Sequence, residues 1–96
     1  IDEEIAFEWA RIPHFYNSFY VYKYATGFSA AISIATQILE NGEESVGKYI
    51  EFLKSGDSDY PIELLKKAGV DLSSSEPIQK ALDTFERLLT ELEELI

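Results

Sequence analysis

The 96-residue sequence contains no cysteine and no methionine, and it has one histidine, one tryptophan and eight basic residues. The absence of cysteine excludes disulfides and cysteine-ligated zinc, and it fits a reducing compartment such as the cytoplasm. The lone histidine, His14, cannot form a multi-histidine metal site within one copy of the chain. We therefore expect these residues to bind no metal or other cofactor on their own.

Basic residues are outnumbered, because eight Lys and Arg stand against 18 Asp and Glu, which gives a formal net charge of −10. Binding to nucleic acid requires a basic face that displaces counterions, so we expect no nucleic-acid partner. No apolar run approaches the roughly 18 residues of a membrane span, and no segment resembles a signal peptide, so we expect no membrane partner. The first residue is Ile1 rather than methionine, and we expect the chain to be processed or cut from a longer protein.

Apolar residues recur at helical spacing through most of the sequence, and no strand pattern competes with them. The sequence therefore predicts an all-α fold of about five helices, a bundle in which residues 1–96 form a single segment. The helices are expected over residues 2–10, 19–39, 43–54 and 60–68 and from Pro77 to the end of the chain.

The expected helix ends follow from proline and glycine. Pro13 ends the first helix and leaves residues 13–18 non-helical. Asn41 and Gly42 end the long helix, because both residues tolerate the left-handed conformation found at helix C-termini. Gly69 closes the helix over residues 60–68.

The faces of the two longest helices predict how they pack. The long helix carries large apolar residues beside many small ones, which indicates burial on several sides with close neighbours. Its faces are Phe28, Ile32, Ala35 and Leu39, and Ile34 and Ile38. The last helix has a heptad seam, which either packs against a neighbouring helix of the same protein or mediates dimerisation. The seam residues are Ile78, Leu82, Phe85, Leu89, Leu92 and Ile96.

Residues 7–28 hold nine of the thirteen aromatic residues. One interpretation is a packed core in which His14 caps or packs. The other is the wall of a cleft, because five of these rings and His14 carry polar atoms that need partners when they are buried. Histidine and tyrosine can both donate hydrogen bonds to an oxygen that gains negative charge during acyl transfer.

Acidic residues cluster at three places, and paired carboxylates can do acid–base work or bind cations. These clusters lie at expected helix starts or on expected solvent faces, which favours a solvated surface. They are Asp2, Glu3 and Glu4; Glu43 and Glu44; and Glu91, Glu93 and Glu94.

Three stretches resemble the end of oligoendopeptidase F-type zinc metallopeptidases, of the thimet oligopeptidase family. Residues 8–16 read Glu-Trp-Ala-Arg-Ile-Pro-His-Phe-Tyr, and residues 19–27 read Phe-Tyr-Val-Tyr-Lys-Tyr-Ala-Thr-Gly. Residues 58–71, from Ser-Asp-Tyr-Pro to Ala-Gly-Val-Asp, resemble the closing region of the same family. The resemblance implies that residues 1–96 are the C-terminal part of the catalytic domain of a larger, helical, zincin-type peptidase.

The resemblance also implies a function, the hydrolysis of short peptides in the cytoplasm by a zinc enzyme. The family's metal site is a helix-borne His-Glu-x-x-His motif with a further glutamate. That motif is absent from this sequence, so the intact enzyme's zinc is expected to be held by the upstream part of the same peptidase. By resemblance His14, with Tyr20 or Tyr24, contacts the peptide substrate and the developing oxyanion.

Two further expectations complete this interpretation. The 96 residues alone are expected to be inactive as a peptidase, and to self-associate as a dimer through their exposed apolar surface. The alternative function, from a different class, is a stand-alone helical module that binds a partner protein through an aromatic face.

Overall fold

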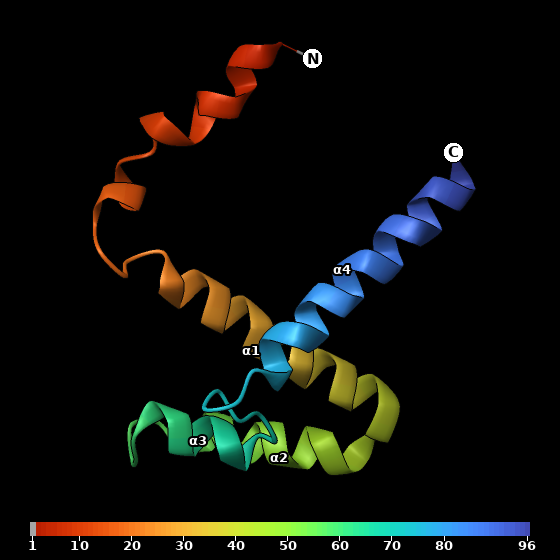
Figure 1. Cartoon of the computed structure of the whole chain (residues 1–96). Helices are drawn as coiled ribbons and strands as arrows, with labels where there is room; N and C mark the ends of the chain where they lie inside the picture. Colours follow the sequence, from red (N-terminus) through yellow and green to blue (C-terminus); the bar gives the residue numbers. More distant parts are fainter. Residues whose placement is uncertain (1) are drawn as a thin grey trace.

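The computed structural model describes residues 2–96, which contain helices and no strand, as the sequence predicts. Two 3₁₀ helices come first, and four α-helices follow them (Figure 1). The elements are η1 (Glu3–Arg11), η2 (Pro13–Tyr16), α1 (Tyr22–Asn41), α2 (Glu43–Lys54), α3 (Pro61–Lys67) and α4 (Glu76–Leu95). Among residues 2–96, none of the helices combines the length and the apolar character that a membrane crossing requires.

The structure corrects two expectations for residues 2–18, which we call the N-terminal arm. The predicted first helix exists, but it is a 3₁₀ helix, capped by the Asp2 Oδ1 atom, which accepts a hydrogen bond from the Glu4 N–H at 3.1 Å. The segment expected to be non-helical, residues 13–18, contains the short helix η2. Pro13 occupies the first position of η2, where its fixed φ suits a helical turn and its missing N–H costs nothing.

The start of α1 lies three residues later than the sequence predicts. Phe19 has a φ of 62°, a left-handed conformation that is rare for a bulky residue. This backbone geometry interrupts the helical path, so the chain turns before Tyr22. The expected end of this helix is correct, because α1 ends at Asn41 and Gly42 follows with a φ of 61°.

The helices α1 and α4 cross and contact each other, as Figure 1 shows. The buried residues of α1, Ser29, Ala30 and Ser33, all have short side chains. The expected burial of α1 on several sides is met in part, because Ile32, Ile34 and Ile38 are half-buried, whereas Phe28 is 68% exposed and Leu39 is 87% exposed. Short side chains allow two helix backbones to approach closely, whereas bulky ones at the same positions would hold them apart.

The heptad seam of α4 is exposed, with accessibilities that range from 38% at Ile78 to 94% at Ile96. The prediction that it packs on a neighbouring helix is therefore not met within residues 2–96. The more buried side of α4 is formed by residues one position before those of the seam. Pro77 is buried there, and Ala81 and Thr84 are half-buried. Pro77, Ala81 and Thr84 follow the same four-then-three spacing, and they lie in the half of α4 nearer to α1.

A turn after α3 connects α3 to α4 and contacts α1. The Gly69 N–H donates to the Lys66 carbonyl oxygen at 2.9 Å, and the Val70 N–H donates to the Leu65 carbonyl oxygen at 3.0 Å. These two bonds form a Schellman motif, which requires a left-handed residue, and Gly69 supplies it with a φ of 88°. Val70 is 1% exposed, and the Gln37 side-chain amide of α1 donates to the Gly69 carbonyl oxygen at 2.9 Å.

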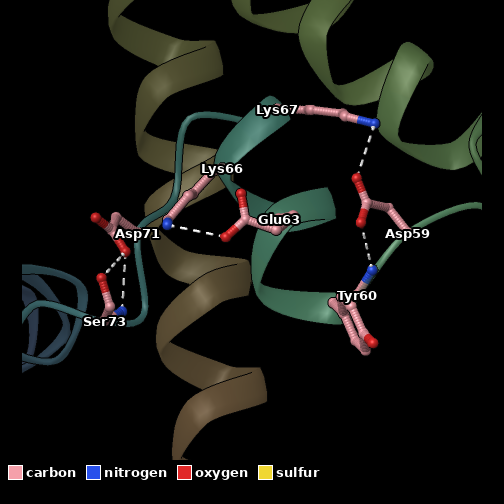
Figure 2. Close-up of polar contacts among 7 residues, drawn as sticks. All are labelled: Asp59, Tyr60, Glu63, Lys66, Lys67, Asp71 and Ser73. Carbon is pink, nitrogen blue, oxygen red and sulfur yellow. Dashed lines mark hydrogen bonds and ion pairs between the residues drawn. The ribbon is translucent and has the colours of Figure 1, made fainter.

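Polar contacts hold the ends of α3 (Figure 2). Before the helix, the Asp59 carboxylate accepts a hydrogen bond from the Tyr60 N–H at 2.8 Å and pairs with Lys67 at 3.8 Å. After it, the Asp71 carboxylate accepts hydrogen bonds from the Ser73 N–H and hydroxyl, which lower the pKa of Asp71. The segments on both sides of this short helix are thereby fixed.

The chain is extended for its length. Its radius of gyration is 16.9 Å, whereas a compact domain of about 100 residues has roughly 13 Å. Its accessible surface is 7861 Å², which is about 2,300 Å² more than the roughly 5,600 Å² of a compact monomer of this mass. All nine aromatic residues of the stretch 7–28 are exposed.

The Gly69 turn yields a stability prediction. Gly69→Ala should lower the free energy of unfolding by about 1–3 kcal/mol, because alanine is strained at positive φ. Its Cβ would also collide with the Gln37 side chain. Urea unfolding of the protein measures this change.

Gly47→Ala is the matched control. Gly47 lies inside α2 and has open space where a Cβ would stand. The free energy of unfolding of the Gly47→Ala variant should rise by about 0.5–1 kcal/mol, because alanine has a higher helix propensity than glycine. Equal effects at the two glycines would contradict the role assigned to the turn.

Candidate functional site

The structure brings His14, Tyr20 and Tyr24, the three candidate residues of the sequence, close together. The His14 and Tyr20 rings stack, with centroids 5.5 Å apart and planes 24° apart. The Tyr20 and Tyr24 rings meet edge to face, with centroids 6.1 Å apart. With Lys23 these residues form what we name the His14 cluster, and all four side chains are exposed.

Local backbone geometry produces this arrangement. His14 lies in η2, and the Tyr20 N–H donates to the Asn17 carbonyl oxygen at 3.1 Å in the turn that follows. The left-handed conformation of Phe19 reverses the chain immediately before Tyr20. Tyr24 lies in the first turn of α1, where its N–H donates to the Val21 carbonyl oxygen at 3.1 Å. The cluster therefore joins η2, the turn and α1.

Tyr16 has a different role from the other tyrosines of this region. Its hydroxyl donates to the Ala10 carbonyl oxygen at 2.6 Å and so ties η2 to η1. The hydroxyl is engaged with the backbone, and the structure places Tyr16 in support of the arm rather than in the His14 cluster.

Lys23 belongs to the cluster but was not among the sequence candidates. Its Nζ atom lies 4.0 Å from the centroid of the Tyr20 ring and 5.3 Å from that of Tyr24. A cation over an aromatic face is attracted by the negative potential of the ring. The signal was present in the sequence, because residues 20, 23 and 24 follow the i, i+3, i+4 spacing of one helix face.

The pKa of the Tyr20 phenol is lowered, first by the neighbouring Tyr24 hydroxyl and then by the Lys23 ammonium. Both neighbours favour the phenolate, each by a hydrogen bond to its oxygen and Lys23 also by its positive charge. A phenol with a lowered pKa is also a stronger hydrogen-bond donor while it remains protonated. The cluster is therefore suited to donating a hydrogen bond to an oxygen that carries negative charge.

An apolar groove of about 640 Å³ lies between α1 and the α2–α3 side of the molecule. Gly27, Ala30 and Ile34 of α1 line one side of it, and Phe52 and Leu65 contribute from α2 and α3. Lys23 also lines this groove, so the groove and the His14 cluster share that side chain.

The residues present do not fit a zinc ion. Within residues 2–96 no group of three His, Cys, Asp or Glu side chains is placed to hold a metal. The three acidic clusters of the sequence are exposed, as expected for a solvated surface. Two of their members make surface ion pairs, Glu44 with Lys48 at 2.7 Å and Glu91 with Arg87 at 2.6 Å.

Comparison with known proteins assigns the chain to a family. Residues 2–84 match Peptidase family M3. The chain belongs to that family. It is 58% identical over 96 residues to oligopeptidase PepF of Bacillus subtilis, and 50% identical over 93 residues to the plasmid oligoendopeptidase F of Lactococcus lactis subsp. cremoris.

A solved structure of this family has the same fold. The crystal structure of oligoendopeptidase-F from Enterococcus faecium superposes with a TM-score of 0.78 at 52% identity, over 98% of this chain. This M3 chain spans 14% of the length of the Bacillus protein, 16% of the Lactococcus protein and 18% of the Enterococcus chain. The similarity therefore covers nearly all of this chain and a small part of each relative.

The His14 cluster predicts a pH effect. Replacing Lys23 with methionine should raise the pKa of Tyr20 toward its ordinary value, because the ammonium no longer stabilises the phenolate. A ¹³C NMR titration of the tyrosine Cζ atoms measures that pKa. Lys48→Met is the control, since Lys48 pairs with Glu44 on α2 and should leave Tyr20 unchanged. A Tyr20 pKa that stays constant in Lys23→Met would refute the assigned contact.

Proposed function

We propose that this chain is the C-terminal part of the catalytic domain of a zinc-dependent oligoendopeptidase, which hydrolyses short peptides in the cytoplasm. Residues 1–96 supply substrate and transition-state contacts, and the rest of the same peptidase supplies the zinc ligands. The observation that carries the proposal is the His14 cluster, found in a chain that is 50–58% identical to proteins named as oligopeptidases.

The cluster's groups fit the task of stabilising an oxyanion. When a peptide carbonyl is attacked, its oxygen gains negative charge and binds preorganised donors more strongly than it did in the ground state. A His14 ring N–H and the Tyr20 or Tyr24 hydroxyl are such donors. Stacking of His14 on Tyr20 limits the rotation of both rings, which lowers the entropy lost when they bind the substrate.

A stand-alone module that binds a partner through its aromatic face is the competing function. The exposure of the aromatic stretch is compatible with it. Membership of a peptidase family over residues 2–84 favours the enzyme instead.

The proposed roles are tested in the intact peptidase. His14→Ala, Tyr20→Phe or Tyr24→Phe should lower kcat by about 10²–10³, the usual effect of losing one oxyanion donor. Zinc content, measured by atomic absorption, should remain at the wild-type value, because these residues are not metal ligands in the proposal. Cleavage of a quenched fluorescent peptide measures kcat.

Two controls accompany this test. Tyr60→Phe removes a tyrosine hydroxyl that is 80% exposed at the start of α3, outside the cluster, and should cleave at the wild-type rate. The 96 residues alone should cleave nothing with zinc added, because no described group of side chains could hold the metal. Full activity of His14→Ala, or zinc-dependent turnover by the 96 residues, would refute the assignment.

We also propose that the 96-residue chain self-associates, most simply as a two-fold dimer. It exposes about 2,300 Å² more than a compact monomer, and a stable interface buries roughly 800 Å² on each partner. The aromatic residues Phe15, Phe19, Tyr20 and Phe28 and the seam around Leu82 and Leu89 supply exposed apolar surface for it.

Sedimentation equilibrium at micromolar concentration tests this. The chain should sediment above its monomer mass of 10.9 kDa, and Phe28→Ala should weaken the association by removing contact area. Tyr60→Ala, a truncation of similar size on α3, should leave the association unchanged. A monomer at all concentrations would contradict the proposal.

A further inference from the structure

Seven of the eight basic side chains make an ion pair with a carboxylate inside the chain. Lys66 pairs with Glu63 at 3.1 Å and Lys67 with Asp59 at 3.8 Å, as Figure 2 shows. The others are Arg11 with Glu8, Lys48 with Glu44, Lys54 with Glu51, Lys80 with Glu76 and Arg87 with Glu91. Within residues 2–96, Lys23 is the basic side chain that remains without a carboxylate partner.

That exception is informative because carboxylates are abundant. The sequence has 18 of them against eight basic residues, so an unpaired lysine is not explained by a shortage of partners. Lys23 instead lies against the faces of Tyr20 and Tyr24. Aromatic faces hold an ammonium by electrostatic attraction, and an ammonium has three N–H donors, so donors beyond the one directed to the Tyr20 oxygen stay available for another acceptor.

The surroundings of Lys23 are arranged for a ligand with both apolar and anionic parts. Lys23 lines the apolar groove along α1, and it touches the rings of the His14 cluster. A ligand that places apolar side chains in the groove would therefore meet an unpaired cation beside the proposed catalytic residues. Apolar walls strengthen such a charge interaction, because they lower the local dielectric constant.

We propose that Lys23 is a specificity-determining residue that binds a carboxylate of the peptide substrate. The inference rests on the proposed peptidase function and deepens it by naming a chemical group that the site selects. With a net charge of −10, the rest of this chain repels an acidic peptide. A single unpaired cation therefore provides the attraction that fixes where the carboxylate binds.

A peptide can supply that carboxylate from its C-terminus or from a glutamate side chain, and three peptides distinguish the sources. They share one apolar sequence. The first has a free C-terminus and no acidic side chain, the second has an amidated C-terminus and one glutamate, and the third has an amidated C-terminus and glutamine in place of the glutamate. The values of kcat and KM are measured for each peptide with the intact peptidase.

Lys23→Met should raise KM about tenfold for whichever carboxylate peptide the wild type prefers, the usual effect of losing a charge-assisted hydrogen bond. This rise in KM should be confined to that peptide, whereas any change in kcat that Lys23→Met causes through Tyr20 should be the same for all three peptides. Lys23→Arg should restore most of the loss, because it keeps the charge. Lys48→Met, which removes a paired lysine on α2, should behave as wild type.

Two results would overturn the proposal. One is an equal change for all three peptides with no selective rise in KM, which would show that Lys23 acts only through Tyr20 and not on the substrate. The other is no change for any peptide. If the intact protein cleaves none of them, the peptidase function fails, and isothermal titration calorimetry of the same peptides tests Lys23 separately. Weaker binding of a carboxylate peptide by Lys23→Met would then support the carboxylate site, and equal binding would refute it.

Discussion

The hydrogen bond between the Gln37 side chain and the Gly69 carbonyl oxygen, 2.9 Å long, is the contact on which the compact part of the structure depends. It joins α1 to the turn after α3, across 32 positions of sequence. The turn can present that carbonyl because Gly69 adopts a positive φ, and the same turn buries Val70. The connection from this turn leads directly to α4, so the place where α4 crosses α1 follows from it.

Small residues decide the rest of the packing. The buried side of α1 consists of Ser29, Ala30 and Ser33, so α1 contributes little apolar volume to the core of the molecule. Within residues 2–96 the buried apolar residues are few and mostly small, namely Ala30, Leu64, Ala68 and Val70. Larger residues such as Phe28 and Leu39 point outward, which explains how a sequence that is 46% apolar has so much exposed apolar surface.

Helix limits were predictable where glycine or proline sets them. The bounds of α2 match the sequence prediction, and α1 ends where Asn41 and Gly42 end it. The start of α1 was not predictable, because nothing in the residue type of Phe19 indicates a left-handed conformation. The packing faces were predicted only in part, because Ile32, Ile34 and Ile38 are half-buried but Phe28 and Leu39 are exposed. Periodicity identifies apolar stripes, but it does not reveal which stripe the rest of the molecule covers.

The sequence supplied candidate residues by resemblance, but it did not supply their arrangement. The sequence indicated His14, Tyr20 and Tyr24, and the structure adds the stacking distances that make them one cluster. Lys23 was missed because the i, i+3, i+4 spacing that it shares with Tyr20 and Tyr24 indicates a common helix face but does not by itself indicate a site. Its significance emerges only from the ion pairs made by the other seven basic residues, which depend on helix register and the loop before α3.

The exposed surface and the His14 cluster have a common explanation. An oxyanion donor is effective only when a substrate reaches it and water is largely excluded, and exposed rings on an open arm meet the first condition but not the second. The chain spans 14% to 18% of the length of its relatives, so most of the surface available to cover the cluster in the proposed peptidase lies outside these residues. The positions of His14, Tyr20 and Tyr24 relative to one another are set by local turns within this chain. The cluster can therefore be preformed here, and in the proposed peptidase the enclosure that strengthens its hydrogen bonds comes from residues outside this chain.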